Sequence, residues 1–231
     1  MKNIGIIVAI KEELDEILEI MKEKKQKKIH NITFYEGKIE NNYVIVVQSG
    51  AGKVNAARTT QILIDKFEIK SIINVGSAGA LTSKLNIGDI VIANKLVQHD
   101  FDITAFNHKK GYVSGIGDYV ECNNELVERL ENISNNIKDE TYKIIKGIIA
   151  SGDIFCTEIQ MKNKIYTKFK AECVEMEGAA IGQVCYLDNI PFAVIRSISD
   201  SPNGNNVIVF EKFIKLAAKR CANILKEFLK Y

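Results

Sequence analysis

The sequence predicts an α/β fold: a single domain, residues 1–231, in which a mixed and twisted central β-sheet is flanked by helices on both sides. Three observations lead to this prediction. Short apolar runs rich in Ile and Val alternate with segments of helical periodicity, which is the pattern of strands covered on both faces by helices. Hydrophobic residues make up 46% of the chain, enough apolar side chain for a well-buried core. No internal repeat and no Pro-rich linker offers a place for a domain boundary.

Seven apolar runs are expected to form strands. They are residues 4–10, 32–39, 43–48, 71–75, 90–97, 143–150 and 192–198. The tripeptide Glu40-Asn41-Asn42 between the second and third runs is typical of a turn, so these two strands are expected to pair as an antiparallel hairpin. A hairpin within this pattern predicts a mixed sheet.

Apolar residues recur with helical spacing in three segments, residues 14–21, 56–64 and 210–228, and the last predicts a long amphipathic helix. Residues 174–180 combine small and apolar side chains with two carboxylates and indicate a buried helix. Lysines are concentrated in residues 22–28, which we interpret as a solvated helix end; a nucleic-acid-binding patch is the alternative.

The composition argues against several classes of protein. The net charge of +2 comes from basic residues spread along the chain, so no nucleic-acid partner is expected. The apolar start is followed at once by acidic residues and reads as a buried strand rather than a signal peptide, and no stretch approaches the ~18 apolar residues of a membrane span. A cytoplasmic protein without a membrane partner is expected. The cysteines form no CxxC pair, so neither a metal site nor a disulfide framework is expected: Cys122, Cys156, Cys173, Cys185 and Cys221.

Two glycine-containing segments follow predicted strands, where ligands bind in open α/β sheets. Residues 49–53, Ser-Gly-Ala-Gly-Lys, precede a helix, and their glycines allow a close backbone approach, as in an anion or sugar cradle. A tight turn explains them equally well. Residues 74–80, Asn-Val-Gly-Ser-Ala-Gly-Ala, are small enough for a ligand to lie against the main chain beside the Ser77 hydroxyl. A turn of small residues made for packing is the alternative.

Charged residues within apolar surroundings are the second kind of candidate. Glu175 and Glu177 interrupt a small and apolar segment, and buried carboxylates need partners: either the hydroxyls of a ribose or a structural ion pair. Arg196, one of four arginines, and Asp200 bracket the end of an apolar strand. Taken alone, Asp200 is better explained as a turn residue ahead of Ser201-Pro202. Glu13 follows the first strand in the first turn of a helix, where acidic residues are common.

These motifs, taken together, resemble the 5′-methylthioadenosine/S-adenosylhomocysteine nucleosidase family of the nucleoside phosphorylase superfamily. The resemblance runs over nearly the whole chain, and the ordered set is far more specific than any one motif. The matching pieces are Ile4-Gly-Ile-Ile7 with Glu12-Glu13, Ser49-Gly-Ala-Gly-Lys-Val54, Asn74-Val-Gly-Ser-Ala-Gly79, Gly88-Asp-Ile-Val91, His99-Asp100, Asp102, Thr104-Ala-Phe106, Ser151-Gly-Asp153, Phe155, Val174-Glu-Met-Glu177 and Arg196-Ser-Ile-Ser-Asp200.

The resemblance implies a nucleoside phosphorylase-like fold and hydrolysis of the N-glycosidic bond of 5′-methylthioadenosine, S-adenosylhomocysteine and 5′-deoxyadenosine, releasing adenine. It implies no metal and no organic cofactor. Glu13 is implied to activate water, which Ser77 and Arg196 position, and Asp200 to protonate N7 of adenine. The implied substrate contacts are Glu177 on the ribose hydroxyls, Met176 on the sugar, Phe155 stacked on the base, the Cys156 backbone at the adenine edge, Ser199 supporting Asp200, and Ile10, Ala51 and Phe210 along the 5′ substituent.

The family's homodimers, in which a phenylalanine of one subunit reaches the other's pocket, imply a homodimer here, and Phe106 matches that phenylalanine. Three positions depart from the family pattern: Val8 stands for a frequent glycine, Lys11 for a frequent glutamate and Ala51 for a larger aliphatic residue beside the 5′ substituent. We expect Ala51 to loosen the substrate preference.

The implied chemistry agrees with what the reaction demands. Cleavage of a ribosyl bond passes through an oxocarbenium-like state, so it needs a proton donor for the departing base and a carboxylate that readies the nucleophile. Glu13 at a helix N-terminus is favoured as the anion that a base must be. Asp200 must instead hold or shuttle a proton, which a desolvated site permits.

Three alternatives stay open. A phosphate-dependent phosphorylase needs cationic groups around a dianion, and the bacterial hexameric phosphorylases place an arginine where this chain has Asn74, so hydrolysis is favoured. A futalosine-type nucleosidase has no distinguishing residue here. A non-catalytic sensor of adenine nucleosides does not call for an acid and a base together.

Overall fold

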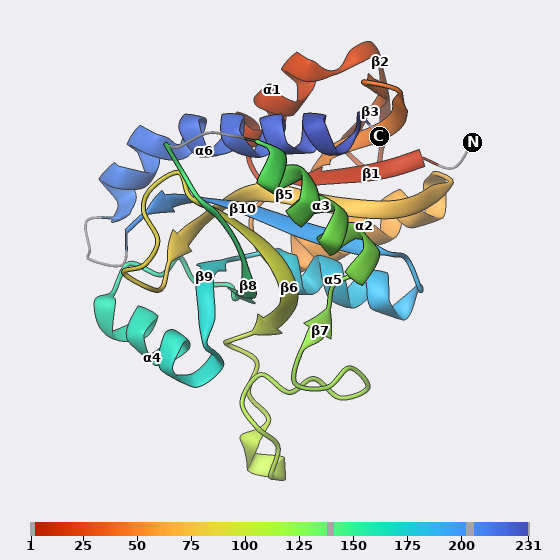
Figure 1. The fold of residues 1–231 in the computed structure, drawn as a ribbon. Helices are drawn as coiled ribbons and strands as arrows, with labels where there is room; N and C mark the ends of the chain where they lie inside the picture. Colours follow the sequence, from red (N-terminus) through yellow and green to blue (C-terminus); the bar gives the residue numbers. More distant parts are fainter. Residues whose placement is uncertain (1–2, 138–140, 202–205, 231) are drawn as a thin grey trace.

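The computed structural model describes residues 3–137, 141–201 and 206–230 (Figure 1). In this part of the chain ten strands form one sheet. They are β1 (Asn3–Val8), β2 (Lys22–Ile29), β3 (Ile32–Ile39), β4 (Asn42–Gln48), β5 (Ile69–Ala80), β6 (Ile90–Gln98), β7 (Val120–Glu121), β8 (Ile144–Ser151), β9 (Ala171–Glu175) and β10 (Phe192–Asp200). The strand order is β10-β6-β8-β9-β5-β1-β4-β3-β2, with β7 beside β6.

The sheet is mixed, as predicted, and part of it is closed. Strand β1 runs parallel to β4 and β5, whereas β3 is antiparallel to both β2 and β4. Strand β10 pairs with β6 and also with β5, so β10, β6, β8, β9 and β5 complete a ring. The sequence did not predict this closure, because strand pairing between distant segments leaves no local signal.

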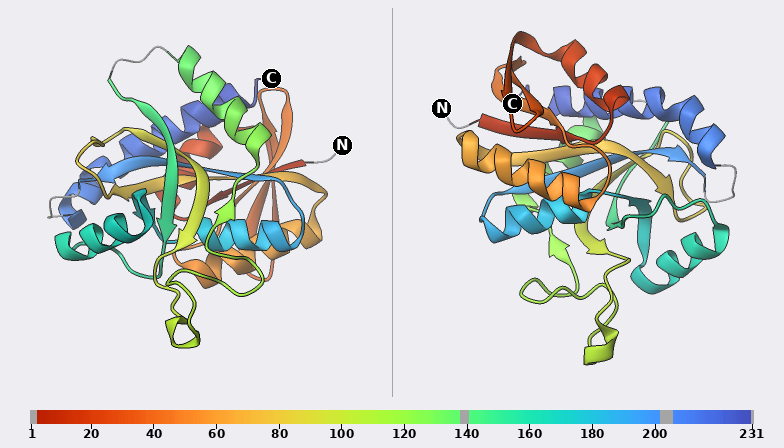
Figure 2. Two further views of the ribbon diagram at one scale, coloured as in Figure 1. Left: turned by 60° about the horizontal axis from the view of Figure 1, so that its bottom comes forward. Right: turned by 180° about the vertical axis from the view of Figure 1, so that it is seen from behind.

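Helices cover both faces of the sheet, as predicted. They are α1 (Lys11–Ile20), α2 (Lys53–Lys66), α3 (Asn124–Asn136), α4 (Ile159–Phe169), α5 (Gly178–Leu187) and α6 (Asn206–Phe228), with a short 3₁₀ helix η1 (Thr104–Phe106). Helices α1 and α6 pack together on one side, and α2 and α5 on the other, which the view from behind in Figure 2 shows clearly. Within the described residues, no helix is both long enough and apolar enough to cross a membrane.

The core strands and the hairpin were readable from the sequence. Strands β1 and β4 lie in the middle of the sheet, and their aliphatic side chains are buried on both faces. The hairpin of β3 and β4 closes as expected, with Ile39 paired to Asn42 and Glu40 in the left-handed region at φ 50°. The predicted helices at residues 14–21, 56–64 and 210–228 correspond to α1, α2 and α6.

Strands β1 and β5 end at other residues than predicted, and both differences shape the site. Strand β1 ends at Val8 because the next two N–H groups, of Ala9 and Ile10, bind the Glu13 carboxylate instead of a neighbouring strand. Strand β5 continues to Ala80 because its small residues pair with β10 and β9. Residues 76–80 are therefore part of a strand and not a turn.

The lysine-rich segment was interpreted wrongly. Residues 22–28 are not a helix end; they lie in β2, the edge strand beside β3. Helix α1 has already ended at Ile20, and the lysine side chains of β2 are exposed. A strand edge covered with lysines resists pairing with another chain, which explains why an edge strand tolerates this composition.

The helix predicted for residues 174–180 is wrong in its first part. Val174 and Glu175 belong to β9, where Val174 is paired with Gly79 of β5 and with Ala150 of β8. Helix α5 begins only at Gly178. Pairing on both sides of β9 outweighs the local propensity of these small residues. Helices α3 and α4 were not predicted, and Pro202 lies outside the described residues.

Candidate active site

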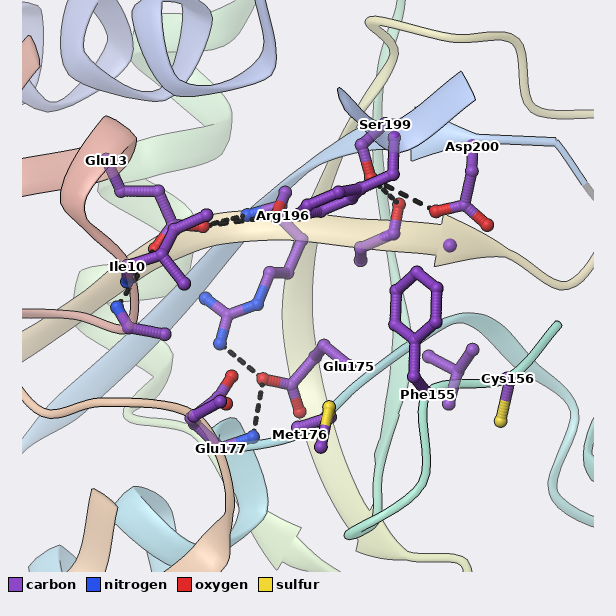
Figure 3. A pocket seen from close by; sticks show the side chains of 18 of the residues that line it. Ile10, Glu13, Phe155, Cys156, Glu175, Met176, Glu177, Arg196, Ser199 and Asp200 are labelled. Carbon is purple, nitrogen blue, oxygen red and sulfur yellow. Dashed lines mark hydrogen bonds and ion pairs between the residues drawn. The ribbon is translucent and has the colours of Figure 1, made fainter. Parts of the chain in front are cut away.

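A pocket of about 190 Å³ lies at the carboxyl ends of β1, β5 and β10 (Figure 3). Segments that are distant in the sequence contribute its walls, and every candidate residue except Phe106 lines it. These residues are Ile10, Glu13, Ala51, Ser77, Phe155, Cys156, Met176, Glu177, Arg196, Ser199, Asp200 and Phe210. Figure 3 shows Glu13 and Asp200 at opposite ends of this one pocket. Asp200 is the last residue of β10 and not a turn residue.

The Glu13 end of the pocket consists of Glu13, Ser77 and Arg196. The Glu13 carboxylate is buried and accepts four hydrogen bonds: from the N–H groups of Ala9 (2.9 Å), Ile10 (3.3 Å) and Ser77 (2.9 Å), and from the Ser77 hydroxyl (3.1 Å). Four donors directed at one carboxyl group stabilise a carboxylate anion.

Arg196 lies between the two ends and is fully buried. Its Nη2 pairs with the Glu175 carboxylate and donates to the Asn74 side-chain oxygen (2.5 Å), while Nη1 donates to the Ile195 carbonyl (3.1 Å). Its Nε–H has no hydrogen-bond partner in the part of the chain that the structure describes. The guanidinium charge is thus already neutralised, but the Nε–H donor has no acceptor among the described residues.

Two interpretations were offered for Glu175 and Glu177: a structural ion pair or a contact with ribose hydroxyls. Glu175 is the structural ion pair: besides Arg196 it binds the Ser151 hydroxyl and accepts from the N–H groups of Glu177 (3.1 Å) and Gly178 (2.8 Å). These bonds fix the chain between β9 and α5. Glu177, which lies in this connection, is thereby held at the pocket wall.

Glu177 is buried and accepts one hydrogen bond, from the Gly52 N–H (2.9 Å). Burial, followed by repulsion from the Glu175 carboxylate, raises the pKa of Glu177 to about 8. The candidate cradle at residues 49–53 is therefore occupied by the protein's own acids, since the Lys53 N–H donates to Asp153 (2.7 Å).

The Asp200 end of the pocket consists of Ser199, Asp200 and a residue that the sequence reasoning missed, Lys162 of α4. The Ser199 hydroxyl donates to Asp200 Oδ1 (3.1 Å), and the Lys162 ammonium donates to Oδ2 (2.9 Å). A usable signal existed, because Lys162, Ile165 and Phe169 follow one another at the spacing of a buried helix face, and all three are buried.

Two aromatic side chains stand near this end. The rings of Phe155 and Phe210 meet edge to face, with centroids 5.7 Å apart and planes at 78°. Phe155 is 43% exposed and lines the pocket, so its ring is accessible to a planar ligand. Figure 3 shows it beside Cys156 and below Asp200.

Two of the glycines of β5 make room for the two acids. A Cβ at Gly76 would lie 2.9 Å from Glu13 Oε1, and a Cβ at Gly79 would lie 2.8 Å from Asp200 Oδ2. Both distances are shorter than a real Cβ contact, so each carboxyl group packs directly on main chain. The small residues of this segment are thus required by the site.

Phe106 does not line the pocket of its own chain. It lies in η1, on a segment that projects from the body of the molecule in all three views (Figures 1 and 2), and its side chain is 76% exposed. No cluster of three or more His, Cys, Asp or Glu side chains suited to a metal ion occurs among residues 3–137, 141–201 and 206–230.

Residues 3–230 match the model of the phosphorylase superfamily. The chain belongs to this superfamily. It is 39% identical to a 5′-methylthioadenosine/S-adenosylhomocysteine nucleosidase of Staphylococcus haemolyticus, over 98% of this chain and 99% of that protein. The family resemblance seen in the sequence is therefore confirmed.

Solved structures of superfamily members agree. The nucleosidase of the same kind from Neisseria meningitidis, in complex with methylthio-immucillin-A, has a TM-score of 0.95 and 33% identity, covering 100% of this chain and 99% of that one. A futalosine hydrolase of Helicobacter pylori is as similar in sequence, at 33% identity, with a TM-score of 0.93 and coverage of 98% and 97%. The superfamily fold thus serves both kinds of nucleoside hydrolase.

Proposed function

We propose that this chain is a nucleosidase that hydrolyses the N-glycosidic bond of 5′-methylthioadenosine, S-adenosylhomocysteine and 5′-deoxyadenosine and releases adenine. One observation carries the proposal: a single pocket holds the Glu13 carboxyl group, which accepts four hydrogen bonds, at one end and a second acid, Asp200, at the other. Such a pair can activate water on one side of a sugar and protonate the leaving base on the other. The nucleosidases to which the chain is similar support the same assignment.

At the Glu13 end, Glu13 is the general base that takes a proton from water as the water attacks C1′. Ser77 and Arg196 position that water: the free Nε–H of Arg196 can donate to it, and the oxygen of the Ser77 hydroxyl, whose proton is donated to Glu13, can accept from it. Because the transition state resembles an oxocarbenium ion, the surrounding carboxylates also stabilise its positive charge.

At the Asp200 end, Asp200 gives a proton to N7 of adenine, and Ser199 orients its carboxyl group. Phe155 stacks on the base, and the Cys156 backbone binds the adenine edge. Protonation at N7 lets the base leave as neutral adenine, which lowers the barrier for breaking the bond between C1′ and N9.

The sugar and its substituent lie between the two ends. Glu177 binds the ribose hydroxyls, since a carboxylate can accept a hydrogen bond from each of two neighbouring hydroxyls, and Met176 packs on the sugar. The side chains of Ile10, Ala51 and Phe210 line the path of the 5′ substituent.

The charges of the pocket favour water over phosphate as the nucleophile. Its lining contains four carboxyl groups, Glu13, Glu175, Glu177 and Asp200, and one guanidinium, Arg196, which Glu175 already neutralises. Asn74, where an arginine would serve a phosphorylase, accepts a hydrogen bond from Arg196 and donates one to the Ile7 carbonyl (2.9 Å). A phosphate dianion would meet repulsion here and no free cation among the lining residues.

We further propose that residues 1–231 form one nucleosidase domain and that the protein is a cytoplasmic homodimer without a cofactor. Phe106 is exposed and lies in η1 on the projecting segment, which supports a homodimer in which it reaches the pocket of the partner subunit. Exchange of this side chain between subunits would complete the apolar part of each pocket.

Adenine release from 5′-methylthioadenosine in phosphate-free buffer tests the proposal. We expect full activity without phosphate and no increase when phosphate is added. Activity that appears only with phosphate would identify a phosphorylase. Because a futalosine hydrolase shares the fold, the same assay should include a futalosine-type nucleoside, and a strong preference for it would reassign the substrate.

A further inference from the structure

Lys162 is a buried cation beside the proposed acid. Helix α4, which packs against β9 (Figure 1), carries it, and its side chain is 1% exposed. Its ammonium donates to Asp200 Oδ2 (2.9 Å) and to the Ser201 carbonyl (2.9 Å). A buried ammonium is costly unless a charged partner compensates it, and Asp200 is the carboxylate within reach among the described residues.

This ion pair conflicts with the simplest account of catalysis. An acid must hold a proton before it can give one to N7, but a carboxylate paired with an ammonium is the ionised form. The proton that is missing from Asp200 is present on its partner, Lys162. A lysine in a desolvated site can give up its proton, unlike an arginine, which stays charged.

We propose that Lys162 and Asp200 together store the proton that leaves with adenine, with Lys162 as the residue that supplies and positions it. The inference rests on the proposed nucleosidase function and extends it. The Nζ–H bond of Lys162 breaks as an O–H bond forms on Asp200; that O–H bond then breaks as N7–H forms.

The remaining steps balance the reaction. The C1′–N9 bond breaks, and its electron pair stays with the base, which leaves as neutral adenine. Water bonds to C1′ and loses a proton to Glu13. When the products leave, Glu13 returns this proton to solvent and the neutral amine of Lys162 takes one up, so the net reaction consumes only water and nucleoside.

Among the residues that the structure describes, those around the pair offer no competing proton donor of the right kind. From β10, Ser199 contributes a hydroxyl; from β5, Gly79 contributes no side chain. The thiols that face the pair are Cys156, after β8, and Cys173, on β9, and burial raises the pKa of both, that of Cys156 to about 11. Glu175 of β9 is already paired with Arg196. Among the described residues around Asp200, the ion pair is therefore the group with a proton to pass to N7.

The test compares the pH dependence of adenine release for the wild type, Lys162→Met and a control, Lys164→Met, which changes an exposed lysine of the same helix. Without Lys162, Asp200 must take its proton from solvent, and the supply of protons from solvent falls as the pH rises. As the pH rises from about 6 to about 9, we expect kcat to fall for both proteins. The fall for Lys162→Met should be at least about tenfold larger than the fall for the wild type. The control should follow the wild type.

A profile for Lys162→Met that parallels the wild type at every pH, even at a lower rate, overturns the inference, because it indicates a structural role only. If Lys162→Met does not fold, carbon-13 NMR of the aspartate-labelled wild type decides, with Asp200→Asn assigning the signal. An ionised Asp200 in the free enzyme at neutral pH is expected, and a protonated one contradicts the inference. A wild type that releases no adenine would instead refute the nucleosidase function.

Discussion

The two ends of the pocket hold their carboxyl groups in different ways. At the Glu13 end, three of the four donors are backbone N–H groups. At the Asp200 end, the donors within the described part of the chain are two side chains, the Ser199 hydroxyl and the Lys162 ammonium. Backbone amides have no proton to give in catalysis, whereas an ammonium has one. The comparison teaches that one end is built to keep an anion and the other to pass a proton.

Replacing the carboxyl group at either end of the pocket should have the largest effect on turnover. Asp200→Asn and Glu13→Gln should each lower the turnover of 5′-methylthioadenosine about 10³-fold, because one lacks the proton for N7 and the other cannot activate water. Both should still bind the nucleoside. On the 4-nitrophenyl riboside with a 5-methylthio group, whose leaving group needs no proton, only Asp200→Asn should recover activity.

Hydrolysis rates of the two variants on both substrates decide this. If Asp200→Asn is as slow on the nitrophenyl riboside as on 5′-methylthioadenosine, proton donation is not the role of Asp200. Near-normal turnover of either variant on 5′-methylthioadenosine removes that residue from the mechanism.

Gly76 and Gly79 of β5 allow the two ends of the pocket to be disturbed one at a time. An added Cβ at Gly76 or Gly79 must displace Glu13 or Asp200, and a misplaced catalytic group can cost up to about 10²-fold in rate. Gly79→Ala should behave like Asp200→Asn on the two leaving groups, and Gly76→Ala like Glu13→Gln. Gly147→Ala is the control, since the three heavy atoms nearest to its Cβ belong to the side chain of Glu172, which does not line the pocket. Equal behaviour of all three variants would show that the close packing has no catalytic importance.

Glu177, between the two ends, should make binding depend on pH. Its pKa of about 8 means that it is protonated in the free protein at neutral pH. If ribose hydroxyls donate to its carboxylate, binding must release a proton below about pH 8, and affinity should rise up to about tenfold per pH unit until that pH and then level off. Calorimetry in buffers of different ionisation enthalpy measures this release. Glu177→Gln should abolish it; release that persists in this variant contradicts the assignment.

The smallest effect is expected at Ala51. A larger side chain there narrows the path of the 5′ substituent, so Ala51→Ile should shift the ratio of kcat/KM about fivefold toward 5′-methylthioadenosine and away from S-adenosylhomocysteine. Rates on the two nucleosides measure the ratio. An unchanged ratio would mean that Ala51 does not set the preference.

The fold was predictable where burial alone decides it. The Ile- and Val-rich runs of β1, β4 and β10 form strands because both faces of the sheet are covered. Residues 22–28 were misread because an edge strand needs no apolar alternation when both its faces meet water. The start of β9 was misread because its hydrogen bonds come from β5 and β8, which are distant in the sequence.

Most residues that line the pocket could be named from the sequence, but their pairings could not. Glu13, Glu177 and Asp200 could be chosen from position and resemblance. That Glu175 and not Glu177 pairs with Arg196, and that Lys162 binds Asp200, depends on how distant elements pack. Only Lys162 left a local trace, as a lysine on the buried face of a helix.

The most direct test is a crystal structure of the wild type with an adenine nucleoside inhibitor that carries a 5′-thio group. The account predicts one molecule in the pocket, with N7 within hydrogen-bond distance of Asp200, the ribose hydroxyls at Glu177, and a water between Glu13 and C1′. An inhibitor with its purine at Glu13, or one bound outside this pocket, would contradict it.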